Sequence, residues 1–163
     1  MNSKTLYLTQ GAIIAALYVI LTLITNAAGL ASGVIQVRIS EALCILPIFT
    51  PAAVPGLLVG CLTSNVMTCC APWDIVFGSL ATLIGAYGSY LLRNHKLAAV
   101  IPPILANTLI IPWILHLVYQ FPGSVLYFTA TVFAGEFISI AILGTLLRIV
   151  LEKNSSAIMW QQK

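Results

Sequence analysis

Long apolar runs with almost no charge follow one another along the whole of this chain. Its 163 residues include seven Lys or Arg and four Asp or Glu, hydrophobic residues make up 60% of the total, and the mean hydropathy is +1.04. A soluble domain carries roughly 25% charged residues, against 7% here, too few to build a water-facing surface. The runs are continuous rather than alternating, which favours membrane-spanning helices over an outer-membrane barrel. We therefore expect an all-α integral membrane protein.

Six transmembrane helices are predicted from these runs and from the turns between them. The expected spans are 6–30, 38–50, 57–70, 75–92, 97–119 and 124–151, in one compact bundle that occupies residues 1–163. A count of five, with 38–70 merged into one helix, would run that helix through Pro51 and Pro55, which break helices. A cleaved signal peptide is rejected for the first span because the apolar stretch exceeds the usual 7–15 residues or so.

The basic residues predict the orientation. With six spans both termini lie on the same side, and that side then holds all the basic residues except Arg38: Lys4, Arg93, Lys96, Arg148, Lys153 and Lys163. Because Lys and Arg are enriched in cytoplasmic loops, we expect both termini in the cytoplasm. The net charge of +3 comes from these span ends, so it gives no reason to expect nucleic-acid binding.

Polar residues that a bilayer would normally exclude gather in the outer half of the predicted bundle. The candidate substrate-binding residues are Arg38, Glu41, Asn65, Trp73, Asp74, Asn107 and Glu136, with His116 and Tyr119 closing the fifth span nearby. Ionisable residues within the membrane pair, line a cavity or mark a substrate path. We therefore predict a ligand pocket that opens to the outside.

Each candidate also has a purely structural interpretation. Arg38 and Glu41 would share a helix face, where they can form an interfacial ion pair. Asn65 and Asn107 can bond across helices, and Asp74 can cap the start of the fourth span. His116 is better explained as an interface residue. A carboxylate halfway down the sixth span, by contrast, needs a partner or a purpose, so Glu136 is the hardest of the candidates to explain structurally.

Other patterns in the chain concern packing and chemistry. Small residues that let helices approach closely form a stripe on the first span, made of Gly11, Ala12, Ala15 and Ala16. Cys44 and Cys61 fall inside spans, where a cysteine usually packs as a small hydrophobe. No metal site is expected, because zinc-ligand spacing is absent, and no nucleophile–base pair indicates a catalytic site. No glycine-rich loop followed by Lys-Ser or Lys-Thr predicts ATP hydrolysis.

Several of these segments together resemble the QueT family. The segment 36–43, QVRISEAL, is the most specific, and it is followed by Leu46-Pro47. The remaining matches are Pro55-Gly56 with Gly60 and Asn65, Trp73-Asp74 with Gly78, and Gly135-Glu136. The resemblance extends over nearly the whole chain. Cys44 departs from it mildly, since a small polar or aliphatic residue is expected at that position.

The resemblance implies a function. QueT proteins are substrate-binding S components of energy-coupling-factor (ECF) transporters, associated with queuosine precursors. The family implies a six-helix subunit of the prokaryotic plasma membrane that binds a 7-deazaguanine outside. It delivers that ligand by docking on a shared transmembrane subunit, EcfT, driven by two ATPases, so the chain itself needs no cofactor and ATP is used by its partners. The small-residue stripe would then be the docking face.

The chemistry of the candidate residues agrees with this expectation. Glu41, Asp74 and Glu136 against Arg38 suit a neutral or cationic ring rich in N–H donors, on which Trp73 can stack, rather than a phosphate. Three alternatives stay open: an S component for another vitamin-like ring, a solitary proton-coupled carrier, and a membrane-embedded enzyme. A chain of this length is short for the inverted repeats that carriers often use, although a dimer could supply them.

Overall fold

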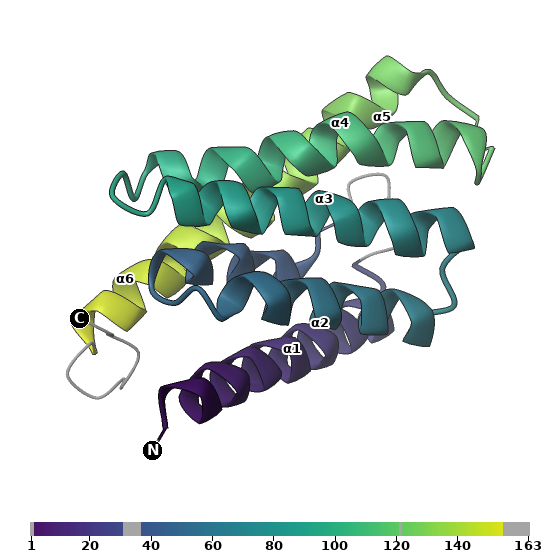
Figure 1. Cartoon of the computed structure of the whole chain (residues 1–163). Helices are drawn as coiled ribbons and strands as arrows, with labels where there is room; N and C mark the ends of the chain where they lie inside the picture. Colours follow the sequence, from purple (N-terminus) through teal and green to yellow (C-terminus); the bar gives the residue numbers. More distant parts are fainter. Residues whose placement is uncertain (1, 31–36, 121, 155–163) are drawn as a thin grey trace.

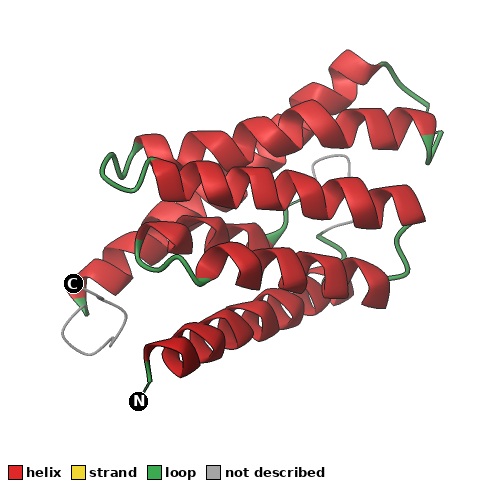
Figure 2. Cartoon of the chain, in the orientation of Figure 1, coloured by secondary structure: helices red, strands yellow, loops and turns green. Residues whose placement is uncertain are grey.

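The computed structural model describes residues 2–30, 37–120 and 122–154, and every regular element in these ranges is a helix (Figure 2). In chain order the elements are α1 Ser3–Ala27, η1 Ile39–Ile48, α2 Ala53–Met67, α3 Pro72–Leu91, η2 Ala98–Val100, α4 Ile101–Leu117, α5 Val125–Glu136, η3 Phe137–Gly144 and α6 Thr145–Lys153. Within the described residues the prediction of an all-α fold is therefore confirmed. The predicted loop 31–37 lies almost wholly outside the described residues.

The helices form a row that is crossed by the C-terminal segment. In Figure 1, α1, α2, α3 and α4 lie side by side in that order, and each packs on the next. The continuous segment α5–η3–α6 runs behind this row, and η3 packs on η1. Within the part of the chain that the structure describes, three helical stretches are long and apolar enough to cross a membrane, namely Ser3–Ala27, Ala98–Leu117 and Val125–Lys153. This fold is that of a multi-pass membrane protein.

Both described ends of the chain lie at the same end of the molecule (Figure 1). Lys96, in the connection between α3 and α4, forms an ion pair of 2.9 Å with Glu152 of α6. Near the other end, the backbone N–H of Ala71 donates a hydrogen bond of 3.1 Å to the hydroxyl of Tyr119. The α2–α3 and α4–α5 connections therefore meet there. This arrangement agrees with an even number of passages through the bundle.

The second predicted span differs from the expectation. The prediction placed a short transmembrane helix at 38–50, whereas η1 is a 3₁₀-helix of ten residues. At a rise of about 2.0 Å per residue it is about 20 Å long, shorter than the roughly 30 Å of a bilayer core. Residues 40–47 are all buried. The element η1 is thus a buried helix that packs against other helices. Pro47 within it has no backbone N–H and could not donate the backbone hydrogen bond of an α-helix.

Glycines on α2 bring it into close contact with α1. A Cβ atom added to Gly56 would lie 2.7 Å from the carbonyl oxygen of Gly11, and one added to Gly60 would lie 3.0 Å from that of Ala15. Gly11 and Ala15 therefore face α2, whereas Ala12 and Ala16 are exposed. The predicted small-residue stripe is divided in two: one half packs inside the bundle, and the other half lies on its outer surface.

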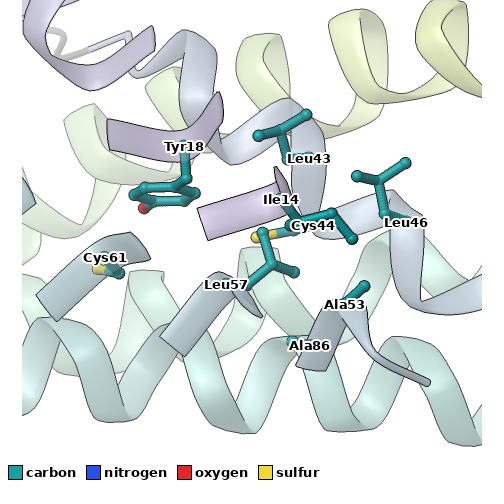
Figure 3. Packing of buried hydrophobic residues seen from close by; sticks show 9 residues of the cluster. All are labelled: Ile14, Tyr18, Leu43, Cys44, Leu46, Ala53, Leu57, Cys61 and Ala86. Atoms are coloured by element: carbon teal, nitrogen blue, oxygen red, sulfur yellow. The ribbon is translucent and has the colours of Figure 1, made fainter. Parts of the chain in front are cut away.

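The main apolar core lies where α1, η1, α2 and α3 meet (Figure 3). Its buried members are Ile14, Tyr18, Leu43, Cys44, Leu46, Ala53, Leu57, Cys61 and Ala86. Three of these side chains end in a hydroxyl or a thiol, so the core already contains polar atoms that need partners. Those partners belong to the candidate site.

Candidate functional site

The carboxylate of Glu41 is held by donors on both of its oxygens. Because a 3₁₀-helix has three residues per turn, Arg38, Glu41 and Cys44 follow one another along one edge of η1. The thiol of Cys44 donates to Oε2 of Glu41 at 3.1 Å, and the hydroxyl of Tyr18, on α1, donates to Oε1. Glu41 is only 1% exposed. A buried carboxylate is tolerated when it is bonded in this way.

The ion pair between Arg38 and Glu41, which was the structural alternative to a role in ligand binding, is not formed. In the described part of the chain, the ion pairs join Glu152 to Lys96 and to Arg148. The guanidinium of Arg38 is half-buried and makes no hydrogen bond with a described side chain, although Asp74 and Glu41 both act on it electrostatically. The hydroxyl of Tyr18, which is not among the predicted site residues, donates a hydrogen bond to the Glu41 carboxylate instead.

Glu136 ends α5, directly before the π-helix η3. Such π-helical turns are rare and are often found at functional sites. Its side chain is 7% exposed and interacts with the amide of Asn107 on α4. Its Oε2 atom, however, is buried and has no hydrogen-bond partner among the described residues. An unsatisfied buried acceptor costs about 1–3 kcal/mol, so this oxygen retains a free position for a hydrogen bond from water or from a ligand.

The geometry brings Arg38 to the same region as Glu136. The backbone N–H of Arg38 donates a bond of 3.1 Å to Oγ of Ser139, whose hydroxyl donates to the carbonyl of Gly135 at 2.8 Å. Gly135 directly precedes Glu136, and the charges of Glu41 and Arg38 both act on Glu136. The contact between η1 and η3 thus joins residues that are far apart in the sequence.

Asn65 and Asp74 border the same space beside Gly78. A Cβ atom on Gly78 would lie 3.3 Å from Nδ2 of Asn65 and 3.4 Å from Oδ1 of Asp74. The other carboxylate oxygen of Asp74 accepts a bond of 3.1 Å from the hydroxyl of Tyr119. Burial raises the pKa of Tyr119 to about 12, so this hydroxyl remains a donor at neutral pH. The capping role considered for Asp74 is wrong, because Ala71 is the N-cap and Asp74 lies within the first turn of α3.

Thiols connect these polar groups across the bundle. The Sγ atom of Cys61 accepts bonds from Nδ2 of Asn65 at 3.6 Å and from the hydroxyl of Thr82 at 3.3 Å. Figure 3 shows the thiols of Cys44 and Cys61 in the same cluster as the ring of Tyr18. From the sequence both cysteines are predicted to serve packing only, and neither Tyr18 nor Thr82 is among the predicted site residues. The one available signal was periodicity, since Tyr18 lies seven residues after Gly11 on the same helix face.

Two of the predicted residues lie away from this cluster. Trp73 is 59% exposed, stacks on Phe77 with ring centroids 6.0 Å apart, and lines an apolar hollow of about 460 Å³ between α3 and α4. His116 is exposed as well. The structure therefore brings together Arg38, Glu41, Asn65, Asp74, Asn107 and Glu136, but not Trp73. Among the described residues, no group of three or more His, Cys, Asp or Glu side chains is arranged to hold a metal ion.

Comparison with known proteins adds the family. The family model described as QueT transporter matches residues 8–153. The protein named Queuosine precursor transporter QueT, from Lactococcus lactis subsp. cremoris (strain MG1363), is 37% identical to the chain over 84 residues. That alignment covers 51% of this chain and 48% of the relative, so the match spans about half the length of the curated protein. No solved structure matches the chain.

The family consists of transporters rather than enzymes. With a family match over most of its length, this chain belongs to the QueT transporter family.

Proposed function

We propose that the chain is the substrate-binding S component of an ECF-type importer and that its substrate is a queuosine precursor, either queuine or an aminomethyl-deazaguanine. Membership of the QueT transporter family and the printed name of the L. lactis relative support a role in transport of such a precursor. The observation that carries the proposal is the buried, unpartnered Oε2 of Glu136, since a guanine-type ring offers the N–H donors that this oxygen lacks.

The charge balance of the site favours a neutral or cationic ligand. Glu41, Asp74 and Glu136 are all at least nine-tenths buried, and Arg38 is the basic residue that lies with them. Hydrogen bonds to a charged acceptor contribute about 1.5–3 kcal/mol, and an aminomethyl substituent would add a cation. A phosphate or a dicarboxylate would meet repulsion at such a site.

The energy for uptake would come from partner subunits. The sequence contains no phosphate-binding loop of the Walker type, so ATP would be bound by two ECF ATPases and transmitted through EcfT. Ala12 and Ala16 are exposed on α1 and would let a helix of EcfT approach closely. We place the protein in the prokaryotic plasma membrane, with both termini in the cytoplasm, on the distribution of its basic residues.

Titration and reconstitution test the proposal together. The purified subunit is titrated calorimetrically with queuine and with the aminomethyl-deazaguanine. It is then placed in liposomes, with and without the three partner subunits and ATP. Binding by the subunit alone, with uptake only in the complete and ATP-supplied complex, is the expected result.

The same experiment separates the alternatives. Uptake by the subunit alone under a proton gradient would identify a solitary carrier. Absence of binding to either precursor, with binding to another vitamin-like ring, would move the protein to a different substrate.

A further inference from the structure

Two charged groups in the cluster lack a hydrogen-bonding partner among the residues that the structure describes. Oε2 of Glu136 is buried and unpartnered within the described residues, and the guanidinium of Arg38 forms no ion pair with any carboxylate described. One of these groups accepts hydrogen bonds and the other donates them. A ligand that satisfies both must therefore present an acceptor and a donor close together.

Glu41 does not compete for such a ligand. Its two oxygens already accept bonds from Tyr18 and Cys44, and it lies on the same edge of η1 as Arg38, one 3₁₀ turn further on. Its bonds fix that edge of η1 against α1. Glu41 is thus a positioning residue: it fixes the chain segment that carries Arg38 and does not need to contact the ligand.

The two unpartnered groups belong to segments that are joined directly. Arg38 bonds through its backbone to Ser139, at 3.1 Å, and Ser139 lies on the helix that carries Glu136. The charge of Arg38 also acts on Glu136. The two side chains therefore come from segments in direct contact, which is the arrangement that a single ligand binding to both would need.

We infer that Arg38 and Glu136 form a two-point recognition pair for a ring lactam. Arg38 donates to the ring carbonyl, and Glu136 accepts from the adjacent ring N–H and from the amino group beyond it. This inference rests on the proposed function, and it deepens that function by stating what distinguishes a guanine-type ring from an adenine-type ring. An adenine-type edge inverts the pattern: it places a donor before Arg38 and a bare ring nitrogen before Glu136.

The test compares two probes that differ only at this edge. The first is 7-aminomethyl-7-deazaguanine, and the second is its 2,6-diamino counterpart, in which the carbonyl is replaced by an amino group and the neighbouring N–H by an unprotonated nitrogen. Because a factor of ten corresponds to about 1.4 kcal/mol, and each of the two charge-assisted bonds contributes at least that much, the wild type should bind the first probe about a hundredfold more tightly. Arg38→Met and Glu136→Gln should each reduce this ratio to about tenfold.

Control variants use the same chemistry elsewhere in the molecule. Arg148→Met and Glu152→Gln change a guanidinium and a carboxylate that pair with each other on α6, and should leave the ratio unchanged. Thermal unfolding without ligand verifies that each variant is folded. If Arg38→Met does not fold, Arg38→Gln retains one neutral donor and should give an intermediate ratio.

The outcomes distinguish failure of the recognition pair from failure of the proposed function. A wild type that binds both probes equally overturns the recognition pair without any variant. A hundredfold ratio that persists in both variants also overturns it, while leaving the proposed function intact. A wild type that binds neither probe, nor queuine, overturns the proposed function and the recognition pair with it.

Discussion

The hydroxyl of Tyr18 donates a hydrogen bond to the carboxylate of Glu41, and this bond attaches α1 to the buried helix η1. Two more side-chain bonds of 2.8 Å attach α1 to this region: Thr22 bonds to Ser40 within η1, and Thr50, two residues after the end of η1, bonds to Gln10. Together they hold η1 in place although it is too short to cross the bilayer alone. The position of Arg38, at the start of η1, depends on these bonds.

Tyr18→Phe should destabilise the protein by about 1–3 kcal/mol, because it leaves one oxygen of the buried Glu41 carboxylate without a donor. Denaturant unfolding in detergent measures the change. Tyr7→Phe, on the exposed part of the same helix, is the control and should have little effect. Combining Tyr18→Phe with Glu41→Gln should cost less than the sum of the single changes, since the two residues share one interaction. Simple additivity would contradict the role given to this bond.

Gly56→Ala should also destabilise the fold, by about 1–3 kcal/mol, because the added methyl group meets the backbone of α1 in a tightly packed contact. The nearest atom, the carbonyl oxygen of Gly11, would lie only 2.7 Å away. Thr63→Ala, at an exposed position on the same helix, provides the comparison in the same unfolding assay. Equal stability of Gly56→Ala and the wild type would show that α1 and α2 can separate at no cost.

Ala12→Trp or Ala16→Trp should abolish uptake by the complete transporter while the isolated subunit still binds its ligand. A bulky side chain prevents close approach of another helix, and both alanines lie on the outer surface of α1. Leu109→Trp, at an exposed position on α4, controls for a general effect of a large surface residue. If uptake survives all three changes, α1 is not the docking surface.

Reporter fusions should place the segment after Lys96 and the C-terminus in the cytoplasm, and a fusion after Pro72 outside. The ion pair between Lys96 and Glu152 requires the first two positions to share a side, so these two reporters act as internal controls for each other. An external C-terminus would overturn the orientation and, with it, a site that opens to the outside.

Glu136→Gln should weaken binding of the aminomethyl-deazaguanine by about tenfold or more, since roughly 1.4 kcal/mol corresponds to a factor of ten. The change retains the shape of the side chain but removes its charge and replaces one acceptor by a donor. Glu152→Gln is the matched control. Unchanged affinity in a folded Glu136→Gln variant would assign Glu136 to helix packing or to proton movement.

The sequence by itself determined the class of the protein and the approximate place of each helix. Hydropathy is a sum over neighbouring residues, so a long apolar run predicts a span without reference to the rest of the fold. The predicted spans 6–30 and 75–92, for example, correspond to α1 Ser3–Ala27 and α3 Pro72–Leu91. The position of a residue along a predicted span can also be counted from the sequence alone. Glu136 could therefore be identified as a mid-span carboxylate that needs a partner.

Only the tertiary structure decided which polar group meets which. A helix can rotate about its own axis without any change in hydropathy. The direction of Trp73, which points outward, and the division of the small-residue stripe between an inner and an outer half are set by packing against neighbouring helices. The Glu41 carboxylate had Arg38 nearby in sequence, but the fold brought the hydroxyl of Tyr18 to it instead. The bond between Tyr18 and Glu41 depends on the contact of α1 with the 3₁₀-helix η1. The apolar pattern of 38–50 does not specify a 3₁₀-helix, because short apolar runs are compatible with several helical geometries.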